Sequence, residues 1–264
     1  MDEKKSKFKS KSISAETKNQ PQKERICEEL SFAAKEAFKR LRTNLIMNFP
    51  ENDEKCHMIG VTSAQPSDGK STISLNLAYS LAELDKKVLL LDGDMRRASL
   101  HTKLGLERSP GLSNLLADSN SITGALREYK SKTDDTYFNI IPSGESPRNP
   151  SELLNSERMT NLLEKLGAAY DYIIVDLPPI GAVVDAVSVA KKLDGMLVVV
   201  RENNCPRGLL EDCMQQLQYA DVNILGFVMN GAMEGSGKGY GYGKYGKYGK
   251  YGKYYKSGYY NNYY

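Results

Sequence analysis

The stretch HMIGVTSAQPSDGKSTISLNLAYSLAELDKKVLLLDGD, residues 57–94, decides the fold of this 264-residue chain. A short apolar run at residues 57–62 leads into a loop that contains a glycine. Residues 71–84 then place apolar side chains at helical spacing, and residues 87–91 are almost wholly apolar. The order strand, loop, helix and strand predicts the first unit of an α/β fold.

The same alternation continues along the chain. Further apolar runs, several of them rich in Val and Ile, occupy residues 138–142, 172–175, 196–200 and 224–229. Helical patterns separate them at residues 152–166, 182–191 and 209–219. Strands that are apolar on both faces are typical of a parallel sheet covered by helices. We therefore predict a doubly wound α/β domain, with a mostly parallel sheet and helices on both faces.

The ends of the chain differ in composition from its middle. Residues 28–48 form an amphipathic pattern that predicts a helix ending before Pro50. Residues 1–25 are polar and basic, so we predict that they are disordered. Residues 235–264 are rich in Tyr, Gly and Lys without aliphatic side chains, which predicts a flexible appendage. The folded domain is thus expected at residues 26–234.

The net charge of +3 is unevenly distributed. Residues 1–25 carry a net +4 and the chain from Lys238 onward carries +6, so the middle carries −7. A nucleic-acid binder is expected to carry its positive charge on a folded face, so this pattern argues against nucleic acid as a partner. It also predicts attraction between the basic tails and the acidic body of the same or a neighbouring molecule.

Localisation follows from what the sequence lacks. It contains no run of about 18 apolar residues that would span a membrane. Its polar N-terminus has no apolar core of a secretion signal. The four cysteines are scattered and show no zinc or disulfide spacing. We therefore expect a cytoplasmic protein.

The loop at residues 64–72, AQPSDGKST, matches the phosphate-loop pattern GxxxxGK[ST] except that Ala64 replaces the first glycine. Backbone N–H groups of such a loop and of the following helix form a site for a polyanion. The loop predicts a P-loop NTPase of deviant Walker A type that binds ATP and Mg²⁺. The expected nucleotide-binding residues are Ser67, Asp68, Gly69, Lys70, Ser71 and Thr72, with Lys70 on the phosphates and Ser71 on Mg²⁺. The residues that hold the adenine are not evident, and Asn230 is a guess.

Two more motifs end buried strands with carboxylates. Residues 89–96 are LLLDGDMR, which supplies Asp92 and Asp94, and residues 173–178 are IIVDLP, which supplies Asp176. The carboxyl ends of parallel strands share one edge of a sheet, so the three aspartates can meet at the phosphate loop. Clustered carboxylates repel one another unless a cation lies among them, and Mg²⁺ prefers oxygen ligands.

Together these three motifs resemble those of the bacterial protein-tyrosine kinases of the BY-kinase family. The resemblance is greatest to the separate cytosolic kinase subunits of capsule and exopolysaccharide systems. It runs from about Glu36 to the end of the chain and includes NPSELL at residues 149–154, similar to a loop-to-helix segment of the family. The resemblance implies Asp92 as the base toward a tyrosine hydroxyl, with Lys70 and Asp94 beside it. It implies Ser71, Asp94 and Asp176 around the metal.

The resemblance also implies self-association and a phosphoacceptor tail. Glu36, Lys39 and Arg42 match an oligomerisation pattern of Glu-x-x-Arg-x-x-Arg, with lysine at the first basic position in place of arginine. Eleven of the 17 tyrosines lie in the last 25 residues. These are the expected acceptors: Tyr240, Tyr242, Tyr245, Tyr248, Tyr251, Tyr254, Tyr255, Tyr259, Tyr260, Tyr263 and Tyr264. Such a tail could instead drive association or stack on single-stranded nucleic acid.

A rival within the same fold is the class of partition and septum-placement ATPases, which use similar motifs as a dimerisation switch. That class carries a signature lysine where this chain has Ala64, and it has no tyrosine tail. By resemblance, the expected partners are further copies of the chain, a membrane-embedded activator with a cytoplasmic segment, and a phosphotyrosine phosphatase. The implied process is control of surface polysaccharide synthesis and export, at the inner face of the plasma membrane.

Overall fold

The computed structural model describes residues 26–50, 55–117, 121–183 and 185–231. The described residues up to Asn230 belong to one compact unit, and a second unit begins at Gly231. The predicted disordered segment 1–25 and the predicted acceptor tail 235–264 both lie outside the described residues.

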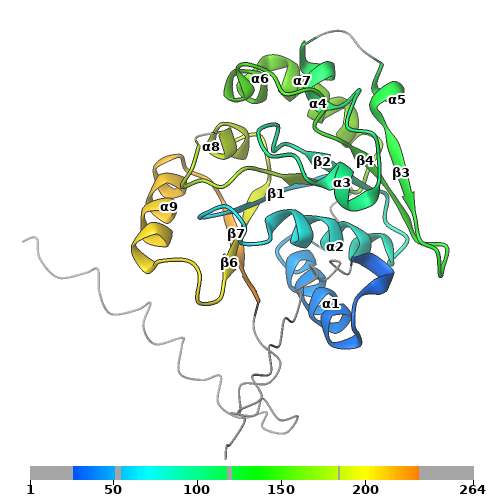
Figure 1. Cartoon of the computed structure of the whole chain (residues 1–264), viewed down its shortest axis with the longest axis horizontal. Coiled ribbons are helices and arrows are strands. Elements are labelled where there is room, and N and C mark those ends of the chain that lie inside the picture. Colours follow the sequence, from blue (N-terminus) through cyan, green and yellow to red (C-terminus); the bar gives the residue numbers. More distant parts are fainter. Residues whose placement is uncertain (1–25, 51–54, 118–120, 184, 232–264) are drawn as a thin grey trace, which may run out of the picture. The chain divides into compact units, whose positions relative to one another are not determined.

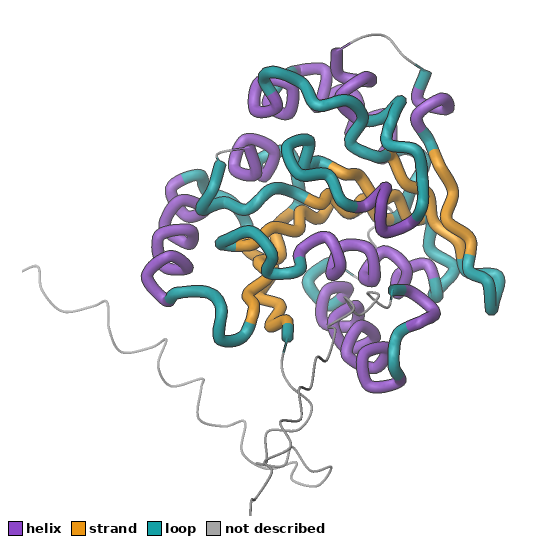
Figure 2. The backbone as a smooth tube through the Cα atoms, in the orientation of Figure 1, coloured by secondary structure: helices purple, strands orange, loops and turns teal. Residues whose placement is uncertain are grey.

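A seven-stranded sheet forms the centre of the domain (Figures 1 and 2), with the strand order β3-β4-β2-β5-β1-β6-β7. The strands are β1 (His57–Ser63), β2 (Val88–Asp92), β3 (Arg127–Lys130), β4 (Tyr137–Ile141), β5 (Tyr172–Asp176), β6 (Gly195–Arg201) and β7 (Ile224–Asn230). All pairings are parallel except that of β3 with β4. The mostly parallel sheet that the sequence predicts is confirmed.

Helices cover both faces of the sheet (Figure 1). In the described part they are the 3₁₀ turn η1 (Cys27–Glu29), α1 (Phe32–Ile46), α2 (Lys70–Ala82), α3 (Leu100–Leu104), α4 (Leu112–Ala117), α5 (Ile122–Ala125), α6 (Pro150–Asn155), α7 (Glu157–Gly167), α8 (Asp185–Ala190) and α9 (Arg207–Tyr219). Elements η1 and α1 to α3 contribute to the core on one face, and α4 to α9 to the core on the other.

Alternation along β2 shows why strands in this sheet are apolar throughout. Leu89 and Leu91 belong to the core under α4 to α9, whereas Val88 and Leu90 belong to the core under α1 and α2. All four side chains are buried, because the sheet has no face open to water at this strand. Truncating one such leucine to alanine costs about 2–5 kcal/mol of folding stability.

Two helix predictions are wrong in their extent. The N-terminal helix starts at Phe32 and not at residue 28, because the Ser31 side chain accepts a hydrogen bond from the Ala34 N–H and caps it. The predicted helix 152–166 is two helices, α6 and α7, divided at Ser156. Ser156 is extended and its side chain accepts from the Met159 N–H, so it begins a new helix.

The topology places the three motifs at one rim. Strands β2, β5 and β1 are neighbours, and each runs toward the loop that carries a motif. Asp92 and Asp176 are register partners at the ends of β2 and β5. The chain order also changes direction around β1, which is where ligands bind in doubly wound sheets.

Candidate active site

The phosphate loop joins β1 to α2 and depends on glycine at position 69. Gly69 has a φ of +96°, and a Cβ built on it would lie 2.1 Å from the amide nitrogen of Asn230. Both the left-handed backbone of Gly69 and its close approach to the Asn230 side chain therefore exclude any residue other than glycine at position 69. Gly69 is the N-cap residue of α2 and has no side chain that could cap the first N–H groups of the helix. This arrangement attracts anions.

Residues at the ends of β6 and β7 hold the phosphate loop from behind. The Arg201 guanidinium donates to the Ser67 carbonyl at 3.1 Å. The Asn204 amide donates to the Asp68 carboxylate at 3.1 Å, and the Asn230 amide donates to the Asp68 carbonyl at 2.8 Å. Sequence reasoning did not identify Arg201 or Asn204. It guessed that Asn230 holds adenine, and in this structure the amide is bonded to the loop itself.

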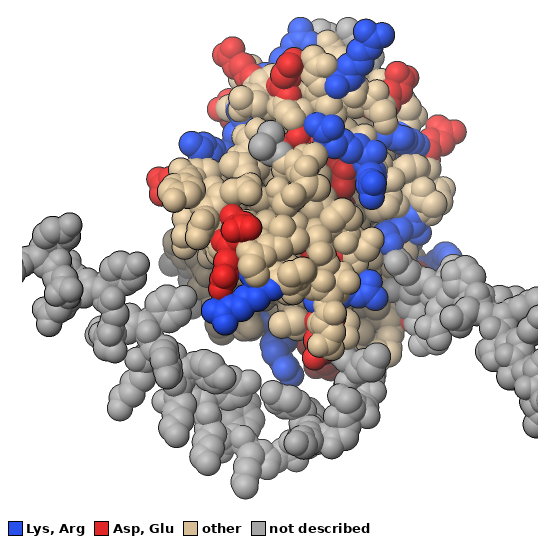
Figure 3. Space-filling model, turned by 60° about the vertical axis from the view of Figure 1, so that its left-hand side comes forward, with Lys and Arg blue, Asp and Glu red and all other residues tan. Residues whose placement is uncertain are grey.

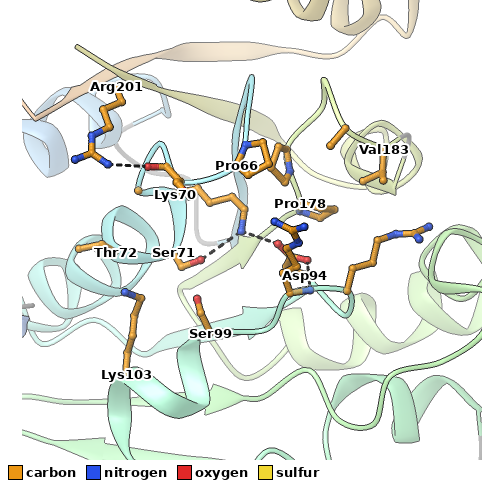
Figure 4. A pocket seen from close by; sticks show the side chains of 16 residues that line it. Pro66, Lys70, Ser71, Thr72, Asp94, Ser99, Lys103, Pro178, Val183 and Arg201 are labelled. Atoms are coloured by element: carbon orange, nitrogen blue, oxygen red, sulfur yellow. Dashed lines mark hydrogen bonds and ion pairs between the residues drawn. The ribbon is translucent and has the colours of Figure 1, made fainter. Parts of the chain in front are cut away.

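Lys70 extends from the start of α2 toward Asp94 and Ser71 (Figure 4). Its ammonium nitrogen lies 2.8 Å from an Asp94 oxygen and 3.9 Å from an Asp176 oxygen. It also lies 3.3 Å from the Ser71 hydroxyl. Burial alone would lower the pKa of Lys70, but Asp176 and Asp94 outweigh it and the pKa is raised. The lysine is therefore charged at neutral pH.

Asp92 and Asp176 are fully buried beneath this lysine. Burial is the main reason that the pKa of Asp92 lies well above its ordinary value, and the neighbouring charge of Asp176 raises it further. Burial also raises the pKa of Asp176, while Lys70 and Ser71 act in the opposite direction. Neither Asp92 oxygen has a partner of good hydrogen-bonding geometry among the described residues. Its carboxylate is thus buried beneath the lysine without a hydrogen-bond partner in the described part of the chain.

The carboxylate cluster suits a hard cation. No three His, Cys, Asp or Glu side chains in the described part of the chain form a metal cage by themselves. Mg²⁺ at phosphate sites does not need one, because it keeps several waters and takes one or two carboxylates with the phosphate oxygens. Ser71 and Asp94 both contact the Lys70 ammonium, and one Asp176 oxygen has no hydrogen-bond partner in the described region. The donor set therefore fits Mg²⁺.

A cavity of about 530 Å³ opens at this rim. Of the six predicted nucleotide-binding residues, five line it: Ser67, Gly69, Lys70, Ser71 and Thr72. The Asp68 side chain does not, because it is buried and turned toward Asn204. Asp94 lines the cavity, whereas Asp92 and Asp176 are not among its lining residues. The sites predicted for phosphate and carboxylates are thus brought together, with two of the carboxylates one layer deeper.

The cavity has a basic rim that the motifs alone did not predict. Arg96, Arg97, Lys103 and Arg201 line it together with Lys70. Positive side chains around a phosphate-sized cavity favour a polyanion. On the face drawn in Figure 3, by contrast, acidic and basic side chains are interspersed and form no continuous basic stripe.

The three residues of the predicted oligomerisation pattern have different surroundings. Glu36 and Lys39 form an exposed ion pair with each other at 2.8 Å on α1. Arg42 instead binds α2 of its own chain, where it donates to the Ser80 carbonyl and lies 3.4 Å from a Glu83 oxygen. Only the first two therefore point outward in this structure. Among the residues described, every helix is too short or too polar to cross a lipid bilayer.

Comparison with known proteins agrees with this geometry. The family model AAA_31, an AAA domain, matches residues 56–217. The tyrosine-protein kinase YwqD of Bacillus subtilis is 35% identical over 207 residues, which cover 78% of this chain and 85% of that protein. The tyrosine-protein kinase ptk of Acinetobacter johnsonii is 35% identical over 195 residues, 74% of this chain. The matched part is 26% of that longer relative.

A solved structure gives the same result. The kinase domain of the Escherichia coli tyrosine kinase ETK superposes with a TM-score of 0.71 at 35% identity, and the match covers 80% of each chain. The sheet, the phosphate loop and the relatives all agree on one assignment. The chain belongs to the family of bacterial tyrosine-protein kinases.

Proposed function

We propose that this chain is an ATP-dependent protein-tyrosine kinase that phosphorylates its own C-terminal tyrosine cluster, in trans within a homo-oligomer. The observation that carries the proposal is the position of Lys70, between Asp94 and Asp176, at the wall of a cavity that opens on the phosphate loop. A lysine held in this way is ready to exchange a carboxylate for phosphate oxygens.

In the proposed complex, the amides of residues 67–72 and the start of α2 bind the triphosphate. Lys70 moves from Asp94 to the phosphates, and Ser71, Asp94 and Asp176 then face the metal. Bound Mg²⁺ would neutralise charge on the phosphate oxygens. The Asp68 side chain serves the loop and not the ligand, since its carboxylate accepts from Asn204.

The proposed reaction transfers the γ-phosphoryl group to a tyrosine. The phenol oxygen forms a bond to the γ-phosphorus while the bond from that phosphorus to the β–γ bridging oxygen breaks, which leaves ADP. Asp92 accepts the phenol proton, a role that suits a carboxylate with a raised pKa. Asp92 lies below the cavity wall, so the displacement of Lys70 by phosphate is the step that opens it to the acceptor.

The proposed acceptors are the eleven tail tyrosines, residues 240–264. Glycines in the tail provide the reach and backbone freedom that an acceptor needs to enter an active site. From Lys238 the unmodified tail carries +6, whereas residues 26–237 carry −7. Each phosphate adds about −1.5 to −2. About four phosphates would therefore cancel or reverse the tail's charge and release it from a neighbouring subunit.

We further propose that α1 contributes to self-association. Glu36 and Lys39 are exposed, and Phe32 at the start of the helix is 80% exposed. An exposed aromatic side chain beside a surface ion pair suits contact with another copy. Arg42 stabilises the α1–α2 pair within the chain, so its part in assembly is indirect.

The wider role rests on analogy with the family. We propose a cytoplasmic kinase recruited to the inner face of the plasma membrane by a membrane-embedded activator, and reset by a phosphotyrosine phosphatase. Its process would be capsular or exopolysaccharide synthesis and export.

The rival ATPase switch is less well supported by this structure. The signature lysine of that class was expected where this chain has Ala64, and none of residues 64–68 (AQPSD) is a lysine or an arginine. No cation therefore extends from this part of the loop to a second nucleotide.

A mixing experiment tests the proposal. Lys70→Met is combined with a variant in which all eleven tail tyrosines are Phe, so one chain has only acceptors and the other only a kinase site. We expect ATP-dependent phosphotyrosine on the Lys70→Met chain in the mixture and none in either variant alone. Phosphotyrosine on purified Lys70→Met without the second variant would contradict the site assignment.

A further inference from the structure

The two loops that follow β2 and β5, which carry or adjoin the proposed metal-facing aspartates, both contribute to the cavity wall. Asp94, Arg96 and Arg97 belong to the loop after β2, and residues 178–183 follow Asp176 at the end of β5. Both loops leave neighbouring strands, and the Gly93 N–H donates to the Asp176 carbonyl at 2.8 Å. Among the described residues no other backbone hydrogen bond joins the two loops, so their separation also depends on side chains.

An ion pair between Arg96 and the buried Asp185 joins the two loops above this point. Arg96 Nε donates to one Asp185 oxygen at 2.8 Å, and Arg96 Nη2 donates to the other at 3.3 Å. Asp185 lies in the first turn of α8, where the loop after β5 ends, and is 1% exposed. The Ser151 hydroxyl, from α6, also donates to Asp185. This bidentate geometry fixes the guanidinium in direction as well as distance.

Arg96 lies two residues beyond Asp94. Asp94 accepts from the Arg97 N–H at 2.9 Å with one oxygen, and meets Lys70 with the other. The Met95 carbonyl between them accepts from Arg108 at 3.3 Å. The loop after β2 is thus fixed by contacts at the Met95 carbonyl and at the Arg96 side chain. These contacts flank Asp94, whose side chain lines the cavity.

A direct role of Arg96 on phosphate is less consistent with the same contacts. Its charge is matched by a buried carboxylate, and Nε and Nη2 are both committed to Asp185. Arg97, by comparison, has a cavity-lining side chain with no hydrogen bond or ion pair to the residues described. Arg96 is therefore better suited to holding the two loops together than to binding phosphate.

We propose that Asp185 is a positioning residue: through Arg96 it holds the loop after β2 against the loop after β5, and so places Asp94 to share a metal site with Asp176. Ser151 supports Asp185, which gives the NPSELL segment a role in the site. The inference rests on the proposed function for its kinase consequence, but not for the metal-dependent binding of nucleotide.

A purely structural role for Asp185 would be to join α8 to α6 by accepting the hydrogen bond of Ser151. Asparagine keeps a side-chain oxygen that can accept this bond, so Asp185→Asn would leave such a role intact. The same substitution removes the charge that pairs with Arg96 while keeping the volume. The two readings therefore differ in their prediction for one conservative variant.

The test is ADP binding to full-length protein, by calorimetry, with Mg²⁺ and with excess chelator. For Asp185→Asn we expect the gain in ADP affinity from Mg²⁺ to fall about 10-fold, since groups that orient metal ligands affect metal affinity by about 10–100-fold. Metal-free ADP binding should stay within about twofold, because Arg201, Asn204 and Asn230 hold the phosphate loop independently. The matched control is Glu211→Gln, which removes the carboxylate partner of Arg207 on α9.

Arg96→Gln provides a second variant, because the side chain at this position is 43% exposed and glutamine keeps an amide that can donate to Asp185. We expect it to lose the Mg²⁺ effect to the same extent, and the double variant to lose no more than either alone. Unchanged Mg²⁺ dependence in both single variants would overturn the proposal, as would equal losses with and without metal. If wild-type protein bound MgADP but never phosphorylated tyrosine, the proposed function would fail while this test would still decide the role of Asp185.

Discussion

Asp92 and Asp176 are direct register partners at the ends of β2 and β5, and both are fully buried. Two carboxyl groups side by side in a dry interior raise each other's cost of ionisation, and Lys70 is the cation that offsets part of this cost in both of them. The nucleotide-free fold therefore carries an electrostatic penalty at the place where a metal-bound phosphate is expected to bind. Functional sites commonly show this conflict with stability.

Replacing Asp92 by asparagine should stabilise the nucleotide-free protein while abolishing phosphorylation. The folded pKa of Asp92 is raised above its ordinary value of 3.8, so its stability contribution is complete below that pH and is lost as the pH rises through the folded pKa. The increase in folding stability caused by Asp92→Asn should thus be larger at pH 8 than at pH 4.5. Each 1 kcal/mol of added stability should raise the melting temperature by about 2–4 °C. A variant that melts below wild type at pH 8 would contradict this view of Asp92.

Replacing Lys70 by methionine should have the opposite effect on stability. The pKa of Lys70 is raised in the fold, so its contribution is present throughout the neutral range and is lost only in strong alkali. Its removal leaves buried carboxylates without a cation, which costs about 3–5 kcal/mol near pH 8 and less near pH 5, where they take up protons. Denaturant unfolding at the two pH values measures this. Lys165→Met, on the exposed face of α7, serves as the control and should unfold like wild type.

Variants at the two basic residues of the α1 pattern should affect different properties, folding stability for Arg42 and self-association for Lys39. Arg42→Ala removes donors to the Ser80 carbonyl and Glu83, so the free energy of unfolding should fall by about 1–3 kcal/mol. Lys39→Ala removes only a surface pair with Glu36, and its unfolding midpoint should not change. Sedimentation should show weaker self-association for Lys39→Ala. Equal loss of stability in both variants would show that the α1–α2 contact is not held by Arg42.

The contacts behind the phosphate loop should matter for affinity. Asn230→Ala deletes the donor to the Asp68 carbonyl, worth about 1 kcal/mol, so the dissociation constant for ADP should rise about 3- to 10-fold. Asn223→Ala is the matched control, because its amide makes an equivalent 2.8 Å bond to the Asp194 carbonyl at the other end of β7. Fluorescent nucleotide titration compares the two. Identical affinities would mean that the loop keeps its shape without this contact.

Tail phosphorylation should weaken self-association, and low salt should exaggerate the effect. Unmodified tails carry +6 from Lys238 and should be drawn to acidic neighbouring bodies, whereas tails with four or more phosphates should not. Light scattering at low salt should show larger assemblies before incubation with ATP than after it. The difference should shrink at high ionic strength, where surface charges are screened. A phosphorylated protein with unchanged oligomeric state at low salt would exclude this mechanism.

The sheet was predictable from sequence because its strands are buried on both faces. Strand β3 was missed, since residues 127–130 (REYK) are polar, alternate in exposure and pair antiparallel at the sheet edge. The break at Ser156 was also missed, because apolar periodicity continues through it and only its capping hydrogen bond reveals the new helix. Helix α8 starts at Asp185, later than expected, since the preceding residues form part of the cavity wall.

The site was predictable only where chemistry is concentrated in a local motif. Lys70 and Asp94 are found from the phosphate loop and from the carboxylates that end a strand, and the register of β2 and β5 then brings Asp176 close. Arg96 and Asp185 are 89 residues apart, and no local pattern links them. Arg42 was expected to face another subunit, but whether it turns outward or onto α2 depends on packing that one helix cannot specify.

The most direct test is the intact mass of the full-length protein after incubation with MgATP, followed by peptide mapping, with Lys70→Met treated in parallel. We predict stepwise gains of one phosphate mass in the wild type, confined to the C-terminal peptide that carries residues 240–264, and none in Lys70→Met. Release of ADP without any gain in mass would contradict the kinase assignment and favour the ATPase switch.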